Sequence, residues 1–201
     1  MGKIGAVILA AGSSSRLGQA KQLLELKGEA LVCRTMRSAR EGGCEIVCIV
    51  TGDRHDEVAR AVGDSEVLVL RNESWTRGIG SSIRTGVDQL SATDTSAIVL
   101  LACDQPALDS GTIRRLIETF EETGKTIVAS HYADTLGIPA LFARQCFIEL
   151  QHLRDDRGAK EIIEAEPARV ARIEFPGGEL DLDIPADLEA WRERCSTGAH
   201  E

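Results

Sequence analysis

The sequence predicts a single α/β domain, in which a mostly parallel sheet lies between two layers of helices. Three observations predict this fold. The chain of 201 residues is long enough for one such domain with a sizeable core. Short apolar runs alternate with segments of helical periodicity. A turn rich in glycine and serine follows the first apolar run, at the place where open α/β sheets bind their ligands.

The predicted strands are short apolar runs, which are typical of strands that are buried in an α/β sheet. In chain order they cover residues 4–9, 46–51, 67–70, 97–102, 127–130, 140–142 and 171–175. Because helical patterns separate most of these runs, we expect mostly parallel strands with helices on both faces. The pair Gly177-Gly178 predicts a hairpin-like reversal of the chain before residues 180–183.

The predicted helices show apolar residues at helical spacing. In chain order they cover residues 31–40, 56–62, 81–89, 112–122, 144–153, 158–164 and 186–194. The last of them begins directly after Pro185, a residue type that is favoured in a first helical turn. We expect the domain to extend over residues 1–195 and the tail 196–201 to be disordered.

Composition and charge exclude several classes of partner. No apolar stretch is long enough to span a membrane, and the first residues lack a secretion signal. We therefore expect a cytoplasmic protein with no membrane partner. The net charge of −9 argues against a nucleic-acid partner, which requires a basic surface. In so acidic a chain, clustered basic residues indicate a local anion site.

The six cysteines do not form a metal or redox motif. No pair has the C-x-x-C spacing, and no cysteine–histidine cluster has the spacing of a zinc site. Most of them lie in apolar periodic segments, where a free cysteine acts as a small hydrophobic residue. We expect reduced thiols that contribute to packing.

The segment from Leu9 to Lys21 carries the most specific functional signal. Glycine and small side chains allow backbone N–H groups to approach an anion closely, and Arg16 and Lys21 add two positive charges. The spacing fits neither G-x-G-x-x-G nor the Walker sequence. We therefore predict a polyphosphate site, and the alternative is a Ser/Gly loop with incidental charges. The candidate binding residues of this site, to which the family resemblance described below assigns a nucleotide, are Leu9, Ala10, Ala11, Gly12, Ser13, Ser14, Arg16 and Lys21.

A second candidate is Asp104, which follows the apolar run 97–102. A carboxylate at the carboxyl end of a central strand faces the ligand crevice, and Mg²⁺ on a substrate phosphate needs only one or two protein carboxylates. From its position alone, two roles of Asp104 are equally favoured. It could be a metal ligand, or it could stabilise the turn at Gln105-Pro106.

A third candidate segment, residues 72–84, lies between a predicted strand and a predicted helix. Gly80, Ser81 and Ser82 open the predicted helix, where free N–H groups and hydroxyls can bond to a ligand. The family resemblance described below extends this prediction to nucleotide binding by Asn72, Gly80, Ser81 and Ser82. The alternative for either serine is a plain N-cap.

These segments resemble the MobA-like nucleotidyltransferases, and the resemblance extends from Ala6 to about Leu188. The first loop is similar to L-A-[AG]-G-x-[SG]-x-R-[MFL]-G-x-x-K, and residues 72–83 are similar to N-x-x-[WY]-x-x-G-[MI]-x-x-S-[LI] of the molybdenum cofactor cytidylyltransferase branch. The resemblance implies a single Rossmann-like, three-layer domain with a mostly parallel mixed sheet, like that of the nucleotide-diphospho-sugar transferases. It also assigns Asp104 to a metal site through the pattern D-[QM]-P.

The segment 181–188 resembles D-[IV]-D-T-P-E-D-L, with Ile184 in place of the usual Thr. The resemblance makes Asp183 the second metal ligand, and the alternative for this residue is an N-cap.

Two further segments resemble the acceptor side of the same branch. Residues 137–142 are similar to G-H-P-x-L-F, with Ile138 in place of His, and residues 155–160 are similar to G-D-R-G-A-[RK]. The implied acceptor-side residues are Gly137, Pro139, Arg157 and Lys160. A charged helix start with Asp156 as its cap is the alternative for the second segment.

The resemblance implies a Mg²⁺-dependent transfer of a nucleoside monophosphate, with CTP as the favoured donor, to the terminal phosphate of molybdopterin or the molybdenum cofactor. Pyrophosphate leaves. The catalytic residues would be Lys21, Arg16 and Asp104, and a molybdenum hydroxylase apoprotein is a further conceivable partner. The alternatives are guanylyl transfer to the same cofactor, transfer to another phosphorylated acceptor, and a non-catalytic cofactor carrier. Ala11 favours cytidylyl transfer, because guanylyl enzymes usually carry Gly there.

Overall fold

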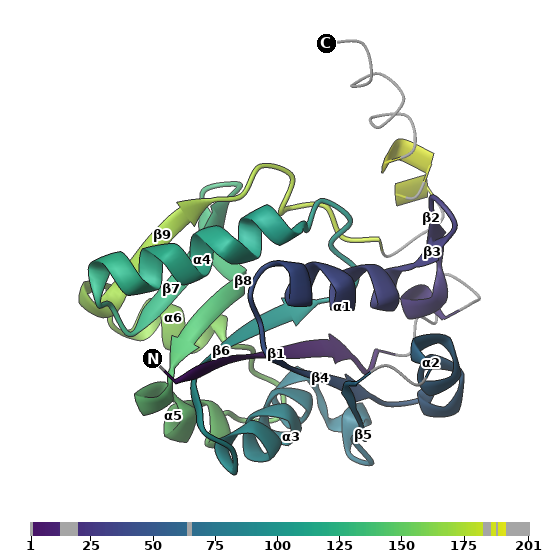
Figure 1. Cartoon of the computed structure of the whole chain (residues 1–201), viewed down its shortest axis with the longest axis horizontal. Helices are drawn as coiled ribbons and strands as arrows, with labels where there is room; N and C mark the ends of the chain where they lie inside the picture. The colour runs from purple at the N-terminus through teal and green to yellow at the C-terminus, as the bar shows by residue number, and fades with distance from the viewer. Residues whose placement is uncertain (1, 13–19, 64–65, 183–185, 188, 192–201) are drawn as a thin grey trace.

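The computed structural model describes residues 2–12, 20–63, 66–182, 186–187 and 189–191. Its centre is a seven-stranded sheet with the strand order β5-β4-β1-β6-β8-β7-β9 (Figure 1). The strands are β1 (Lys3–Ala10), β4 (Ile46–Thr51), β5 (Leu68–Arg71), β6 (Thr95–Ala102), β7 (Ile127–Tyr132), β8 (Thr135–Ala143) and β9 (Val170–Glu174). All seven predicted strands are present, and the predicted α/β fold with a mixed sheet is confirmed.

The sheet is parallel from β5 to β6, and the carboxyl ends of these strands meet at one edge. In the register of the central strands, Val7 of β1 pairs with Cys48 of β4 on one side and with Leu100 of β6 on the other. Strand β8 is antiparallel to both of its neighbours, β6 and β7. Strand β9 is again parallel to β7. The residues directly after β1, Ala11 and Gly12, and the turn after β6 therefore lie at the same edge of the sheet.

Helices cover both faces of the sheet (Figure 1). One face carries α1 (Leu31–Glu41), α2 (His55–Val62) and α4 (Ser110–Thr123), and the other carries α3 (Ile79–Ser91), α5 (Phe147–Gln151) and α6 (Lys160–Ala165). The predicted helix 144–153 is shorter, because a 3-10 turn over Arg144–Cys146 precedes α5. Of the predicted helix 186–194, the described residues 186–187 and 189–191 are helical.

Each face of the sheet has its own hydrophobic core. Along β1, Ala6 and Ile8 pack toward α1, whereas Val7 packs toward α3, as the alternation of strand side chains requires. All three side chains are completely buried. Burial of a valine or isoleucine side chain stabilises a fold by roughly 1.5–3 kcal/mol, so the central strand anchors both layers.

Two details depart from the prediction. The short antiparallel pair β2 (Glu25–Leu26) and β3 (Glu29–Ala30) was not predicted, because its strands are too short to give a pattern. The predicted run 140–142 is only the end of the nine-residue β8. The β7–β8 hairpin turns through Ala133 and Asp134, both with positive φ, and the pair lacks the glycine that usually marks such a turn.

The described cysteines are free thiols, as expected. Cys44 and Cys48 are buried, and desolvation raises the pKa of each thiol to about 12. Such thiols stay protonated and serve as packing groups. The sixth residue, Cys195, lies outside the described residues, as does the expected tail 196–201.

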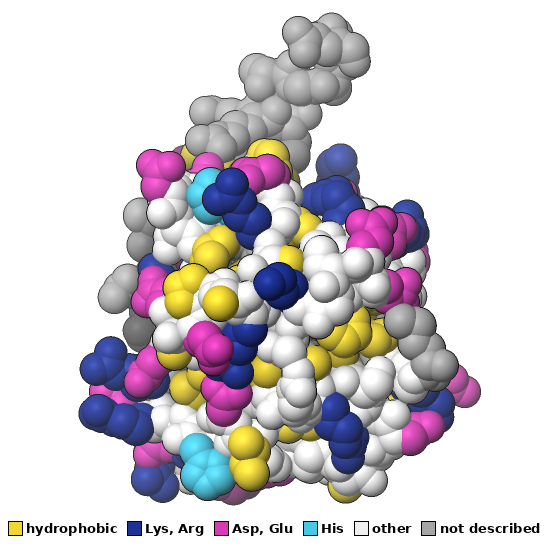
Figure 2. Space-filling model, turned by 90° about the vertical axis from the view of Figure 1, so that its left-hand side faces the viewer, with side chains coloured by type: hydrophobic (Ala, Val, Ile, Leu, Met, Phe, Trp, Pro, Cys, Tyr) yellow, Lys and Arg dark blue, Asp and Glu magenta, His cyan; other side chains and the backbone are white. Residues whose placement is uncertain are grey.

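The described part of the chain contains no helix long and apolar enough to cross a membrane. Figure 2 shows the side of the molecule on which the N-terminus lies in Figure 1. On this side Lys and Arg side chains are interspersed with Asp and Glu (Figure 2).

Candidate active site

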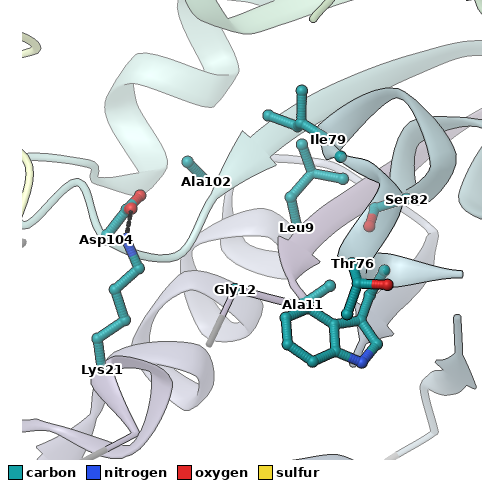
Figure 3. A pocket seen from close by; sticks show the side chains of 11 residues that line it. Leu9, Ala11, Gly12, Lys21, Thr76, Ile79, Ser82, Ala102 and Asp104 are labelled. Atoms are coloured by element: carbon teal, nitrogen blue, oxygen red, sulfur yellow. Dashed lines mark hydrogen bonds and ion pairs between the residues drawn. The ribbon is translucent and has the colours of Figure 1, made fainter. Parts of the chain in front are cut away.

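A cavity of about 380 Å³ opens where β1 and β6 end and α3 begins. Its two sides differ in character. Figure 3 shows Lys21 and Asp104 on one side of the cavity and Leu9, Ile79 and Ser82 on the other. The complete lining is Leu9, Ala11, Gly12, Lys21, Trp75, Thr76, Gly78, Ile79, Ser82, Ala102 and Asp104. A charged side beside a largely apolar recess suits a ligand with an ionic part and a flat organic part.

The charged side consists of an ion pair between Lys21 and Asp104. Lys21 begins a 3-10 turn over Lys21–Leu23, and Asp104 lies two residues beyond β6. The adjacent ends of β1 and β6 thus bring together two residues that are 83 positions apart. Their side chains are only 17% and 18% exposed, so solvent screens the pair weakly. A ligand could replace either partner of the pair. Lys21 would then pair with an anionic group of the ligand, and Asp104 with a cation.

Gln22 ties the turn that carries Lys21 to the end of β1. Its side chain is 1% exposed, and Nε2 donates hydrogen bonds to the carbonyl oxygens of Ala10 (3.0 Å) and Gly12 (2.7 Å). The sequence analysis missed this supporting role. No pattern in the sequence marks this role, because it depends on contacts with the backbone at the end of β1.

Trp75 forms part of the apolar wall and was also missed as a site residue. It lies in the 3-10 turn Trp75–Arg77, close to Gly52 at the end of β4. A Cβ on Gly52 would lie 2.5 Å from the carbonyl oxygen of Ala11 and 2.6 Å from Cγ of Trp75. Glycine at position 52 therefore allows Trp75 to pack directly against the first loop. An aromatic residue in a polar loop at this sheet edge was the signal that could have found it.

The four predicted residues of the segment 72–82 are three residues that do not line the cavity and one, Ser82, that does. Nδ2 of Asn72 donates hydrogen bonds to Oγ of Ser81 (2.8 Å) and Oγ of Ser82 (3.0 Å), and its Oδ1 accepts one from the N–H of Ser74. The N–H of Gly80 donates to the carbonyl oxygen of Asp155 (2.9 Å). Of the predicted residues in this segment, only Ser82 lines the cavity. Nucleotide contact by the other three stays a prediction.

The residues at Asp104 fit a hard divalent cation. Asp104 lines the cavity with a carboxylate, which is the preferred ligand type of Mg²⁺. The N–H of Leu182 donates to the carbonyl oxygen of Asp104 (3.0 Å), so the acidic C-terminal segment passes beside it. No cluster of three or more acidic, His or Cys side chains suited to a metal occurs among the described residues. A cation here would therefore rely on few protein ligands and on substrate phosphates. Asp183 lies outside the described residues, as do Ser13, Ser14 and Arg16.

The predicted acceptor-side residues do not line this cavity. Lys160 donates from Nζ to Oγ1 of Thr135 (2.7 Å), and Arg157 lies 3.8 Å from a carboxylate oxygen of Glu161. The carbonyl oxygen of Pro139 accepts a hydrogen bond from Ser130. Both cationic side chains are more than half exposed. Their part in binding an acceptor stays a prediction.

This arrangement is the one expected of a nucleotidyltransferase, in which fixed charges surround the reacting phosphates and an apolar recess takes the base. Residues 6–170 match the MobA-like NTP transferase domain, and the chain therefore belongs to that family of nucleotidyltransferases. The resemblance inferred from the sequence motifs is confirmed.

Three proteins that are similar in sequence to this chain are named for different functions. Purine catabolism protein PucB of Bacillus subtilis is 26% identical, covering 94% of this chain and 96% of that protein. Molybdenum cofactor cytidylyltransferase of Escherichia coli is 26% identical, covering 96% and 98%. Nicotine blue oxidoreductase of Paenarthrobacter nicotinovorans is 36% identical, but only over 55% of this chain and 54% of that protein.

Solved structures show the same fold. The crystal structure of Rv0371c from Mycobacterium tuberculosis has a TM-score of 0.80 and 30% identity, covering 96% of this chain and 98% of that one. A second structure of the same protein, in complex with manganese, has a TM-score of 0.76 and 27% identity over 95% and 98% of the two chains.

Proposed function

We propose that this nucleotidyltransferase transfers a nucleoside monophosphate, with CTP as the favoured donor, to the terminal phosphate of molybdopterin or its molybdenum form. The observation that carries the proposal is the Lys21–Asp104 pair on one side of the cavity. The full-length similarity to a molybdenum cofactor cytidylyltransferase supports the choice of acceptor. The manganese complex of Rv0371c supports a divalent metal.

The chemistry requires positioning and charge stabilisation rather than a covalent intermediate. An oxygen of the acceptor phosphate forms a bond to the α-phosphorus, and the bond from the α-phosphorus to its bridging oxygen breaks. The electron pair leaves with pyrophosphate. Because the acceptor phosphate is already an anion, the reaction needs no general base.

In this proposal Lys21 and Asp104 separate and take different partners. The ammonium of Lys21 stabilises the negative charge that develops on the α-phosphate, and Arg16 with the first loop holds the leaving pyrophosphate. Asp104 and Asp183 would hold Mg²⁺. When bound, the metal would neutralise negative charge on the phosphates.

The apolar side of the cavity is assigned to the base and ribose of the donor. Trp75 and Ile79 give this side a flat and partly exposed apolar surface, and Ser82 adds a hydroxyl. Arg157 and Lys160 are assigned to the anionic acceptor, as the family pattern implies.

The test is to incubate the protein with Mg²⁺, molybdopterin and each of the four nucleoside triphosphates in turn, and to identify the nucleotide product by mass. We expect the CMP adduct together with pyrophosphate, and neither product with Asp104→Asn. A GMP adduct would replace the donor assignment with guanylyl transfer. Pyrophosphate release only with another phosphorylated compound would replace the acceptor.

A non-catalytic carrier is the alternative from a different class. It would bind molybdenum cofactor but release no pyrophosphate with any triphosphate. The pair of Lys21 and Asp104 favours the enzyme. A protein that only binds the cofactor does not need a lysine to stabilise a reacting phosphate. Retained cofactor binding with no pyrophosphate from the wild-type protein would establish the carrier instead.

A further inference from the structure

The wall of the cavity at Gly78 and Ile79, together with the adjacent Gly80, packs backbone against backbone on the loop 153–158. A Cβ on Gly78 would lie 2.2 Å from the carbonyl oxygen of Asp155, and a Cβ on Gly80 would lie 2.0 Å from that of Arg154. Neither oxygen belongs to a flexible side chain, so neither contact could be relieved cheaply. The N–H of Gly80 also donates to the carbonyl oxygen of Asp155 (2.9 Å). The loop therefore supports the start of α3 directly.

The side chain of Asp155 stabilises the contact between the loop 153–158 and the start of α3. One carboxylate oxygen pairs with Nη2 of Arg84 in α3, and the other lies 2.6 Å from Nη2 of Arg77 in the preceding turn. Arg84 also donates from Nη1 to the carbonyl oxygen of Leu153. The side chains of Asp155 and Arg84 are 23% and 25% exposed. The hydrogen bond from Arg84 lowers the pKa of Asp155, so the carboxylate stays ionised at neutral pH.

The two arginines connect Asp155 to the wall of the cavity. They flank Gly78 and Ile79, both of which line the cavity. Asp155 itself does not line it. Its two ion pairs therefore support the wall from outside the cavity.

We infer that Asp155 is a positioning residue for donor binding: it pairs with Arg84 and Arg77 and thereby fixes the wall at Gly78 and Ile79 against which the donor nucleotide packs. The identity of the ligand as a nucleotide rests on the proposed function. The same contact joins that wall to the loop that carries Arg157, so the donor and acceptor sides share one support.

The experiment uses Trp75 as a reporter, because it lines the same cavity. The chain contains two tryptophans, and Trp191→Phe leaves Trp75 as the only one. In this background we compare Asp155→Ala, Arg84→Met and the conservative Asp155→Glu. The matched control is Asp156→Ala, which removes the same charge from the next residue, whose side chain is 62% exposed. Fluorescence titration with CTP and Mg²⁺ gives the Kd, and steady-state rates give KM and kcat.

We expect the Kd and KM for CTP to rise about tenfold in Asp155→Ala and Arg84→Met, because a charge-assisted hydrogen bond no longer fixes the wall. The value of kcat should change less than about twofold, since the reacting groups are untouched. Asp155→Glu should restore part of the affinity, and Asp156→Ala should match the parent. Melting temperatures verify that every variant is folded.

Hydrogen exchange of the Gly80 amide in the nucleotide-free protein gives a second readout. We expect faster exchange in Asp155→Ala than in Asp156→Ala, because the Gly80 N–H bonds to Asp155. Equal Kd values and equal exchange in these two variants would overturn the inference. If the parent binds no nucleotide, the proposed function fails, and the exchange rates then decide alone whether Asp155 positions the wall.

Discussion

At the residue scale, Lys21 and Asp104 line the cavity and at the same time neutralise each other. Their value to a nucleotidyltransferase lies in their placement, since Gln22 ties the turn of Lys21 to β1 and the end of β6 presents Asp104. A ligand that carries both a cation and phosphates can replace one ion pair by two. Charges that are fixed before the ligand arrives need little reorganisation during the reaction.

Replacement of Lys21 by Ala should lower kcat by about 10²–10³ and weaken nucleotide binding much less, because the ammonium is needed mainly when charge develops on the α-phosphate. Steady-state kinetics and Trp75 fluorescence separate the two effects. Lys3→Ala is the control, since it removes an exposed lysine that pairs with Asp94 near the start of β1. Near-normal turnover of Lys21→Ala would remove this lysine from the mechanism.

At the element scale, α3 both forms part of the cavity and packs tightly on the central strand. A Cβ on Gly86 would lie 2.3 Å from Cγ1 of Val7, so only glycine allows this approach of helix and strand. This packing helps to fix the position of the start of α3 relative to β1. It therefore also affects how far the first residues of α3 lie from Leu9. The same helix is held at its start by the loop 153–158.

Replacement of Gly86 by Ala should destabilise the protein by about 1–3 kcal/mol through overpacking, although alanine favours a helix by about 1 kcal/mol. Urea unfolding of the variant measures the loss. The matched control is Gly111→Ala in α4, where the nearest atom to the new Cβ is 3.5 Å away and belongs to a side chain. The control should be neutral or slightly more stable. An equal change in both variants would show that helix propensity, and not the fit against Val7, governs Gly86.

A second element-scale prediction concerns the ion pair between Glu149 of α5 and Arg169, just before β9. The two hydrogen bonds from Arg169 lower the pKa of Glu149. Because this pKa is lower in the folded than in the unfolded chain, the pair stabilises the fold above the ordinary carboxyl range. That stabilisation is lost as the pH falls through the lowered pKa.

Glu149→Gln should therefore lower the free energy of unfolding by about 0.5–1 kcal/mol at neutral pH, the size typical of a partly exposed pair. The difference from wild type should stay constant down to about pH 5.5 and shrink below about pH 4.5. Urea unfolding across this pH range tests it, with Glu41→Gln as a surface control. A difference that grows on acidification would contradict the assigned direction of the pKa shift.

At the scale of the whole molecule, the site forms where separate parts of one sheet edge meet. β1 contributes the first loop, β6 contributes Asp104, and β5 leads through Trp75 into α3. A ligand that fills the cavity therefore contacts segments that only the folded chain brings together. Its binding should stabilise the native state as a whole.

CTP with Mg²⁺ at about one hundred times its Kd should add about 2.7 kcal/mol to the free energy of unfolding. For a domain of this size the melting temperature should rise by roughly 5–10 °C. Thermal unfolding with CTP, GTP and ATP, each with Mg²⁺ or with EDTA, measures the effect. We expect the largest shift for CTP with Mg²⁺ and a smaller one with EDTA. Equal shifts with and without the metal would argue against a metal-assisted donor site.

The sequence by itself determined the fold class and the order of the strands along the chain, and it predicts an anion site in the first loop. These are local properties: apolar runs, helical periodicity, and a turn of small residues with Arg16 and Lys21 need no knowledge of distant contacts. The family followed from several motifs in a fixed order, and the comparison over residues 6–170 confirms it.

Only the tertiary structure decided which of the candidate residues share a cavity and which support it. Ser81 and Asn72 carry the same chemical groups as a nucleotide-binding pair, yet their hydrogen bonds connect them to each other. The parts played by Gln22 and Asp155 depend on neighbours from other parts of the chain, which no local pattern encodes. The physical reason is that a side chain's partner, its burial and therefore its availability to a ligand are set by packing between segments that are distant in sequence.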